Sequence, residues 1–340
     1  MLKHLPLLGV VAAILIGGYF YFKPSLFQNT QPQKYTGPVE KINFSSSPGI
    51  KNVAVYIAKS KGYFQEEGLD VNTTEVPSAK QAFSNMLDGK GVDISAVADT
   101  PVVIASFERN DFYILATISE GHDEKVIARK DKGINVVTDL KGKKVGLAGK
   151  GIGNHFFLST LLTFNGLTEK DVEIVVIDGK KLLSALENST LDAIAVVEPD
   201  ASKAKKLLGD KAVVFPNQGI YRKTFELMVR KDFAQNHPET LIRFLRAIGK
   251  ANKFINENKE ESQSLVAEVL KLDKKEVTAI WDENSKTLSL DQSLLLTLEE
   301  EARWAIKNKL TDKTTVPNYL NYIYFDALEK VKPEAVTIVH

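Results

Sequence analysis

Short apolar or alternating runs follow one another from Lys41 onward, separated by stretches whose apolar residues recur at helical spacing. Val92–Val97 is apolar enough for a buried strand, whereas Ala79–Asp88 has the period of a helix that ends near Gly89. Strands separated by helices predict parallel βαβ units with right-handed crossovers. The pattern therefore predicts an α/β protein with parallel sheets.

The alternation begins again after Ile118 and changes to nearly pure helical periodicity after Asp232. Two consecutive α/β units predict two lobes, joined by crossing segments near Val126–Lys130 and Glu226–Arg230, with a helical C-terminal tail that wraps the first lobe. About 300 residues are enough to give each lobe its own core. The predicted domains are residues 41–127 with 228–340 for lobe 1 and its tail, and residues 128–227 for lobe 2.

An unbroken uncharged run, Leu5–Phe22, precedes the α/β pattern, with Lys3 before it. At about 1.5 Å per residue, roughly 18 residues just span a bilayer core. We therefore expect an N-terminal transmembrane signal anchor over residues 1–23 and a flexible linker over residues 24–40. A cleaved secretion signal is the alternative. Lys3 favours a cytoplasmic N-terminus, which places the remaining chain on the periplasmic or extracellular face of the cytoplasmic membrane.

The composition is that of a globular protein, with 44 basic and 43 acidic residues and a formal net charge of +1. Because the two signs are mixed along the chain, the charge pattern does not indicate a nucleic-acid partner. The chain has no cysteine, which excludes disulfides and thiolate chemistry. It lacks the motifs of a nucleophile elbow, P-loop or zinc-binding helix, and its histidines lack metal-ligand spacing. We therefore expect neither an enzyme nor a bound metal or cofactor.

Polar residues follow several of the predicted strands. In open α/β sheets, ligands bind beyond the carboxyl ends of the strands, where helices begin. If two lobes face each other, these ends line one cleft. The candidate ligand-binding residues are Ser46, Ser47, Asp99, Thr100, Ser119, Gly153, Asn154, His155 and Glu198.

The segment Ala148–Phe156, AGKGIGNHF, passes from a predicted strand into a predicted helix. Its glycines allow close approach of a ligand, and the amides of a helix N-terminus suit an anionic group. A tight turn with Asn154 as the N-cap is an equally weighted structural interpretation. The spacing G-x-G-x-G differs from the dinucleotide fingerprint, so a nicotinamide-dependent enzyme is disfavoured.

Three other candidates also have structural alternatives. A lone histidine such as His155 is more often a capping or packing residue than a ligand contact. Asp99 is as well placed to cap the helix that begins behind it as to touch a ligand. Glu198 could equally pair across the closed cleft. The candidate serines and Thr100 are common turn residues, so only their shared placement distinguishes them.

Five segments, taken in order, resemble the solute receptors for nitrate, taurine and aliphatic sulfonates. The similarity extends over about Lys41 to Ala335, nearly the whole folded part. The segments are AKSKGYFQEEGLDV (Ala58–Val71), LDGKGVDISAVADTP (Leu87–Pro101), DLKGKKVGLAGKGIGNHFFLSTLLTFNGLTEKDVEIV (Asp139–Val175), LDAIAVVEPDASKA (Leu191–Ala204) and DFAQNHPETLIRFLRAIGKANKFINEN (Asp232–Asn258).

The resemblance implies a type II periplasmic-binding fold that closes by hinge rotation and passes its ligand to an ABC permease and ATPase. It places the anionic head of the ligand at Ser46, Asp99-Thr100, Ser119, Gly153-Asn154-His155 and Glu198. Two features depart from the family pattern. Val197 stands where sulfonate receptors often carry an aromatic residue, and Asp99 with Glu198 adds negative charge, which leaves a zwitterion such as taurine, or a cationic ligand, open.

We therefore expect a monomeric, extracytoplasmic solute-binding protein that captures a small organic anion or zwitterion, such as a sulfonate, taurine or a nitrate-like ion. It would deliver this ligand to an ABC importer. A membrane-tethered sensory domain and a receptor for a thiamine-pyrimidine precursor are the alternatives.

Overall fold

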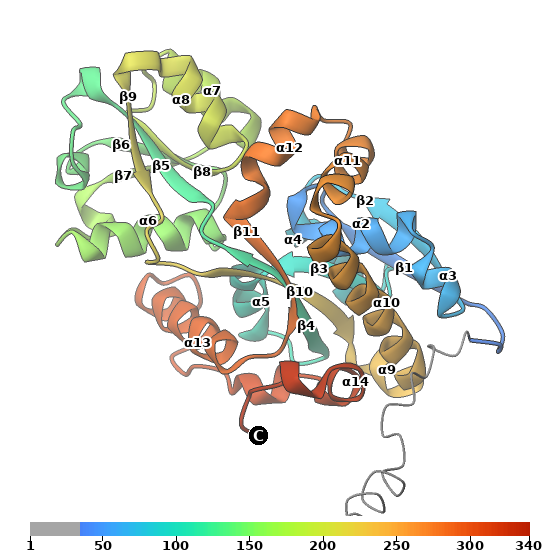
Figure 1. Ribbon diagram of the computed structural model, residues 1–340. Helices are drawn as coiled ribbons and strands as arrows, with labels where there is room; N and C mark the ends of the chain where they lie inside the picture. The colour runs from blue at the N-terminus through green and yellow to red at the C-terminus, as the bar shows by residue number, and fades with distance from the viewer. Residues whose placement is uncertain (1–34) are drawn as a thin grey trace, which may run out of the picture. The chain divides into compact units, whose positions relative to one another are not determined.

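Two β-sheets organise the chain in the computed structural model, which describes residues 35–340 (Figure 1). The strand order is β11-β4-β10-β3-β1-β2 in the first sheet and β7-β6-β8-β5-β9 in the second. We call the part built on the first sheet lobe 1 and the part built on the second sheet lobe 2. The strands are β1 (Glu40–Ser46), β2 (Leu69–Glu75), β3 (Ile94–Ala98), β4 (Phe112–Gly121), β10 (Lys223–Arg230) and β11 (Asn284–Ser289) in lobe 1, and β5 (Glu124–Arg129), β6 (Lys144–Leu147), β7 (Glu173–Val176), β8 (Ala193–Val197) and β9 (Ala212–Pro216) in lobe 2.

The sheets are mixed rather than parallel, which corrects the sequence-based expectation. Strands β1, β2 and β3 are parallel, as are β6, β7 and β8. Strand β10 runs antiparallel to β3 and β4, and β5 runs antiparallel to β8 and β9. The reason is that β5 and β10 each begin where the chain enters a lobe, so they run away from the junction between the lobes. Strands β1, β3, β6 and β8 instead bring their carboxyl ends to that junction.

The two links between the lobes are short. The first connects Gly121 at the end of β4 to Glu124 at the start of β5, and the second connects Pro216 in β9 to Lys223 in β10. The expected crossing segments, Val126–Lys130 and Glu226–Arg230, lie mostly inside the strands that follow these links. The apolar pattern identifies those strands correctly, but it does not show that the polar residues just before them are buried.

Helices flank both sheets, and their bounds follow the predicted periods closely. In lobe 1 they are α2 (Val53–Ser60), α3 (Tyr63–Glu66), α4 (Ala79–Leu87) and α5 (Asp99–Ser106), and in lobe 2 they are α6 (Gly153–Phe164), α7 (Gly179–Glu187) and α8 (Asp200–Leu208). The tail contributes α9 (Lys231–Asn236), α10 (Pro238–Glu257), α11 (Lys259–Leu270), α12 (Lys274–Ile280), α13 (Gln292–Lys307) and α14 (Phe325–Val331). Short 3-10 helices are η1 (Ile50–Asn52), η2 (Lys130–Lys132), η3 (Val137–Leu140), η4 (Glu169–Asp171), η5 (Gly209–Lys211), η6 (Trp281–Glu283), η7 (Tyr319–Tyr322) and η8 (Pro333–Ala335).

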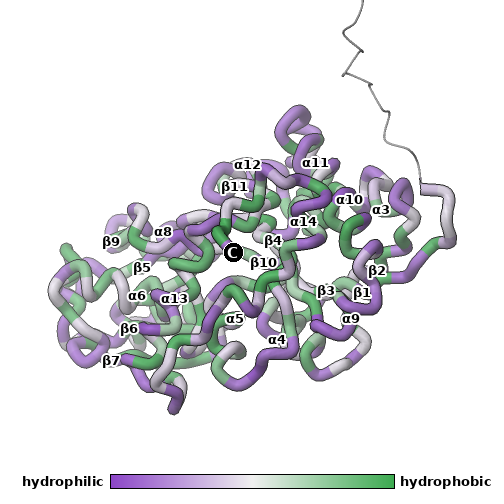
Figure 2. Tube along the Cα trace, turned by 90° about the horizontal axis from the view of Figure 1, so that it is seen from below, coloured by the Kyte–Doolittle hydropathy of each residue, from purple (hydrophilic) through white to green (hydrophobic). Residues whose placement is uncertain are grey.

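Most of the tail packs on lobe 1. Hydrophobic and hydrophilic positions alternate along its trace (Figure 2), and α10 lies against α2, α3 and α14. The ring of Phe244 in α10 packs 5.0 Å from that of Phe64 in α3. The tail is not purely helical, however, because Asn284–Ser289 forms strand β11 at the edge of the first sheet beside β4. A short polar strand of this kind has no apolar run that would reveal it.

The expected membrane anchor, Leu5–Phe22, lies outside the described residues. Within residues 35–340, no helix combines the length and the apolar character needed to cross a bilayer.

The packing of lobe 2 leaves no room for a side chain at Gly146 in β6. A Cβ atom there would lie 2.4 Å from Leu191 Cδ1 and 2.9 Å from Leu182 Cδ2, and both leucines are buried. We predict that Gly146→Ala lowers the free energy of unfolding by about 1–3 kcal/mol through overpacking. The matched control is Gly249→Ala inside α10, where a Cβ atom would lie 3.7 Å from Leu288 Cδ2, an ordinary contact distance.

Gly249→Ala should stabilise the protein by about 0.5–1 kcal/mol because alanine is the better helix former. Urea unfolding of both variants, followed by circular dichroism, measures the two effects. Equal midpoints for Gly146→Ala and the wild type would contradict the packing described for β6.

Candidate functional site

A group of buried polar residues lies where the two links cross between the lobes. It combines residues from η1, α5, α13, both links and the first residues of β5 and β10. We call this group the junction cluster; its members are Lys51, Asp99, Asp123, Glu124, Tyr221, Lys223 and Glu301. Asp99, Glu124 and Glu301 are fully buried, and Asp123, Tyr221 and Lys223 nearly so. Because burying an unpaired charge costs free energy, the ion pairs and hydrogen bonds within the cluster determine which of its groups can still bind a ligand.

One half of the cluster consists of ion pairs. Asp123 Oδ1 lies 3.0 Å from Lys51 Nζ and 2.9 Å from Lys223 Nζ, and Lys223 also pairs with Glu124. Burial opposes the charge of Asp123, but the two ammonium groups outweigh it and hold the pKa of this carboxyl well below its usual range. Burial would likewise lower the pKa of Lys223, but Asp123 and Glu124 raise it. At Glu124 burial wins, and the pKa is raised. Burial lowers the pKa of Lys51.

The other half of the cluster is a hydrogen-bond network around Asp99. Tyr221 Oη donates to Asp99 Oδ1 at 2.6 Å, and the backbone amide of Thr224 donates to Asp99 Oδ2 at 2.8 Å. Thr100 Oγ1 donates to Glu301 Oε1 at 2.9 Å, whereas Glu301 Oε2 has no hydrogen-bond partner within the described residues. Burial raises the pKa of both Asp99 and Glu301. Asp99 therefore ties the start of β10 to the start of α5.

The N-terminus of α6 faces this cluster. A Cβ atom at Gly153 would lie 3.2 Å from Tyr221 Oη, 3.3 Å from Lys223 Cδ and 3.6 Å from Glu124 Oε1. The N-cap position is occupied by Ile152, and no side chain caps the helix, so the interpretation of Asn154 as the N-cap is wrong. The backbone amides of Gly153 and Asn154 make no hydrogen bond within residues 35–340. Free amides and a helix dipole at this point suit an anionic group.

At α5 and α8, by contrast, one backbone amide of the first turn donates to a carboxylate from the same segment of the chain. Asp99 Oδ1 accepts from the amide of Thr100 at 2.8 Å, and Glu198 Oε2 accepts from the amide of Ser202 at 3.0 Å. Glu198 also pairs with Lys125 Nζ at 2.6 Å, and Lys125 reaches Glu283 of the tail at 2.8 Å. The N-cap of α5 is Ala98, so Asp99 is not the N-cap residue, although it accepts from the amide of Thr100. The partner of Glu198, Lys125, belongs to the neighbouring strand of the same sheet, so this ion pair does not cross between the lobes.

His155 forms a contact between the lobes. The amide of Gly151 donates to His155 Nδ1 at 3.2 Å, and His155 Nε2 lies 3.3 Å from Glu169 Oε2. Trp304 of α13 packs with its ring centroid 5.0 Å from that of His155 and donates its Nε1–H to Glu169 Oε1 at 3.3 Å. His155 therefore has the surroundings of a packing residue, which was the structural alternative for it.

The remaining candidates lie in local hydrogen-bond arrangements. Asn52 Nδ2 donates to Ser46 Oγ at 3.2 Å and to the carbonyl of Ser47 at 2.8 Å. Asn154 Nδ2 donates to the carbonyl of Ala195 in β8 at 3.0 Å. Ser119 is buried, and its hydroxyl has no partner within the described residues. Of the nine candidates, the structure brings Asp99, Thr100 and Gly153 together around Tyr221.

Sequence reasoning missed most of the junction cluster. Asp123, Glu124, Tyr221 and Lys223 stand in or beside the links, where the sequences GHDE and YRK look like ordinary polar strand starts. One sequence signal could have identified these residues: their charges stand where the α/β pattern begins again, which is where the chain passes between the lobes. Glu301 occupies a buried position of the helical period of α13, and an acidic residue at such a position also marks a buried contact.

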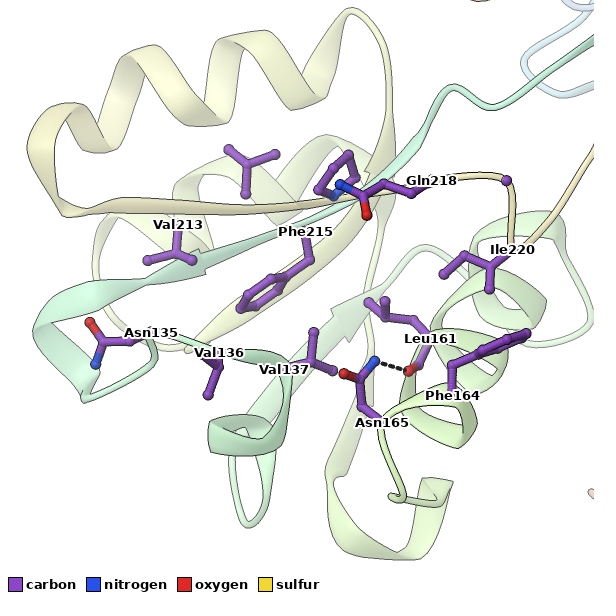
Figure 3. A pocket seen from close by; sticks show the side chains of 13 residues that line it. Asn135, Val136, Val137, Leu161, Phe164, Asn165, Val213, Phe215, Gln218 and Ile220 are labelled. Carbon is purple, nitrogen blue, oxygen red and sulfur yellow. Dashed lines mark hydrogen bonds between the residues drawn. The ribbon is translucent and has the colours of Figure 1, made fainter.

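An apolar groove of about 690 Å³ lies elsewhere on lobe 2, beside β9 and α6 (Figure 3). Its walls include Val137, Leu161, Phe164 and Phe215, and its polar residues are uncharged amides. Asn165 lies at its edge and donates to the carbonyl of Leu161 at 2.8 Å. A groove without charged groups does not suit an anion, so we place the candidate site at the junction cluster instead.

Two lobes, each built on a mixed β-sheet flanked by helices, are joined by two short links, and a buried polar site lies between them. This is the architecture of periplasmic solute-binding proteins. The chain belongs to the family described as NMT1/THI5 like, whose model matches residues 50–262. It is 30% identical over 265 residues to the "Putative aliphatic sulfonates-binding protein" of Bacillus subtilis (strain 168), covering 76% of this chain and 79% of that protein.

Solved structures share the fold. The periplasmic aliphatic sulphonate binding protein SsuA from Escherichia coli matches with a TM-score of 0.73 and 19% identity, over 84% of this chain and 92% of that one. The desulfurization enzyme DSZB matches with a TM-score of 0.65 and 15% identity, over 87% of this chain and 99% of that one. Since both a binding protein and an enzyme have this fold, the fold alone does not distinguish the two activities.

Glu226 in β10 is a fully buried carboxyl close to the junction cluster. Thr117 Oγ1 donates to its Oε2 at 2.7 Å, and Oε1 has no partner within the described residues. Burial raises the pKa of Glu226 to about 8. The folded state therefore holds a proton on this group at neutral pH, while the unfolded chain releases it near the ordinary value of about 4.5.

The contribution of Glu226 to stability is thus present below about pH 4.5 and is lost as the pH rises to about 8. We predict that Glu226→Gln removes a negative slope of up to about 1.4 kcal/mol per pH unit from the free energy of unfolding across this window. Urea unfolding at pH 5, 6, 7 and 8 measures the slope. Identical slopes in the wild type and the variant would show that Glu226 is charged in the folded protein.

Proposed function

We propose that the chain is an extracytoplasmic solute-binding protein that captures a small organic anion at the junction between its lobes and delivers it to an ABC permease and ATPase. The observation that carries this proposal is the uncapped N-terminus of α6, where the free amides of Gly153 and Asn154 face Lys223 and Tyr221. Amide donors, a hydroxyl and a buried ammonium together provide charge-assisted hydrogen bonds to an anion.

Among anions, a sulfonate fits this set of donors well, because its three oxygens can accept from the amides, the hydroxyl and the ammonium at once. The names of the Bacillus relative and of the Escherichia coli structure favour the same class. A zwitterion such as taurine is the second candidate. It is supported by Glu301, whose buried Oε2 lacks a partner within residues 35–340 and could accept from an ammonium group.

The proposal includes the location and the motion of the protein. We propose a type II binding fold on the outer face of the cytoplasmic membrane, tethered as a monomer by Leu5–Phe22. Lobe 2 would rotate about the two links. The contacts of Trp304 with Glu169 and of Lys125 with Glu283 would then form on closure and hold the lobes together.

Two glycines of the same loop offer a matched test of the site. A Cβ atom at Gly153 would crowd Tyr221 Oη and Lys223 Cδ at 3.2 and 3.3 Å, whereas one at Gly149 would have only Ile152 Cδ1 near it, at 3.9 Å. We predict that Gly153→Ala weakens the binding of ethanesulfonate at least about tenfold, corresponding to about 1.4 kcal/mol. Gly149→Ala should bind as the wild type does.

Isothermal titration calorimetry on the purified protein measures these affinities, preceded by a thermal-shift screen against ethanesulfonate, taurine, nitrate and a pyrimidine. A ligand present at 100 times its Kd should stabilise the protein by about 2.7 kcal/mol. Equal affinities for the two alanine variants would reject α6 as the anion site. Turnover of a bound ligand into a product would reject the transport function in favour of an enzyme.

A further inference from the structure

Glu124 occupies the space directly in front of the free amides of α6. Its side chain is fully buried, and its Oε1 lies 3.6 Å from the position that a Cβ atom would take on Gly153. Lys223 Nζ forms an ion pair with this oxygen, and no second donor reaches Oε1 within the described residues. The other oxygen, Oε2, receives only a long contact of 3.5 Å from Asn217 Nδ2. A buried carboxylate is rarely left with so few donors.

The charges around Glu124 make the binding of a second anion beside it electrostatically unfavourable. Lys223 of β10 and Lys51 of η1 face it with positive charge, and Asp123 of its own link faces it with negative charge. Asp99 of α5 and Glu301 of α13 lie in the same buried cluster, and Asn217 Nδ2 of the second link contacts both Glu124 Oε2 and the carbonyl of Tyr221, whose hydroxyl donates to Asp99. An external anion placed against Lys223 would therefore join the carboxylates of Asp123 and Glu124, and three negative charges would share the two ammonium groups of Lys51 and Lys223. Like charges held this close favour protonation of one of them.

We propose that the carboxylate of Glu124 occupies the anion position at the α6 N-terminus when no ligand is bound. When an external anion replaces it beside Lys223, Glu124 takes up one proton from solvent. This inference rests on the proposed function of the junction cluster. In the bound state, the ligand oxygens accept from Lys223 and the α6 amides. The neutral carboxyl of Glu124 then donates its O–H to the ligand instead of repelling it. The raised pKa of Glu124 shows that burial already favours its neutral form.

Proton uptake couples affinity to pH. Below the pKa of Glu124 in the empty protein, the carboxyl is already neutral and affinity is constant. Above that pKa, each pH unit should weaken binding up to about tenfold, because a proton must be taken up with the ligand. Ethanesulfonate is the suitable probe, since a sulfonate does not titrate between pH 5 and 9 and any proton taken up must therefore come to the protein.

Isothermal titration calorimetry with ethanesulfonate, in two buffers of different ionisation enthalpy at each pH from 5 to 9, tests the proposal. For the wild type we expect buffer-dependent heats that rise toward one proton per ligand at the alkaline end. In Glu124→Gln the side chain is neutral at every pH, so the uptake should vanish and the affinity should no longer depend on pH. Glu226→Gln is the control for a buried carboxyl outside the site, and it should retain the uptake.

The possible results separate this inference from the function on which it rests. Binding by the wild type with buffer-independent heats and constant affinity would overturn the role of Glu124 and leave the proposed function standing. Uptake that persists in Glu124→Gln, or that disappears in Glu226→Gln, would also overturn it. No binding of ethanesulfonate at any pH would overturn both. Even if Glu124→Gln does not fold, buffer-independent heats in the wild type would overturn the role of Glu124.

Discussion

The carboxylate of Asp123 holds two ammonium groups that come from different parts of the chain. Lys51 reaches it from η1 in lobe 1, and Lys223 reaches it from the first residue of β10, while Asp123 itself stands in the first link. These contacts tie both passages of the chain between the lobes to each other and to lobe 1. Removing one partner of such a buried set would leave an uncompensated charge, which costs several kcal/mol. The positions of Glu124, Tyr221 and the α6 N-terminus all depend on this arrangement.

The helices that meet this region differ in how their N-terminal amides are satisfied. Those of α5 and α8 are bonded to Asp99 and Glu198, which are permanent parts of the protein. At α6, the N-cap residue is Ile152, whose side chain cannot accept a hydrogen bond, and the carboxylate near Gly153 comes from another segment of the chain. A carboxylate that lies next to the helix whose amide it accepts from cannot be replaced by a ligand. A carboxylate supplied by a neighbouring segment can move away and let a ligand take its position. The chemistry of the junction therefore concentrates at α6.

The positions of individual strands and helices could be predicted from the sequence, because each depends on the hydrophobic pattern of a short stretch of chain. The periods over Lys144–Leu147 and Ala193–Val197 identify β6 and β8 to the residue. Strand direction is not local, and β5 and β10 run opposite to their neighbours because of where the chain enters each lobe. Strand β11 was missed because NSKTLS at the edge of a sheet needs no apolar run.

The site was predictable only in part, for a similar reason. The rule that ligands bind at strand ends singled out Asp99, Thr100 and Gly153, and the structure brings these three residues together around Tyr221. It could not single out Glu124 and Lys223, because their burial arises only when two links, far apart in the sequence, come together. His155 was noticed for its residue type, but its surroundings, Trp304 and Glu169, come from segments that no local pattern connects to it.

The position of β10 between β3 and β4 also constrains the order in which the protein can fold. Phe225 pairs with Ala98 on one side and with Ser119 on the other, so the middle of the first sheet stays open until the chain of lobe 2 has been completed. Lobe 2 is one continuous segment and can assemble from contacts that are close in sequence. Lobe 1 must wait for its central strand, which makes its closure the slow, long-range step of folding. Lobe 1 therefore cannot complete its first sheet before the chain has passed beyond the last residue of lobe 2, whereas lobe 2 does not depend on lobe 1 for any of its strands.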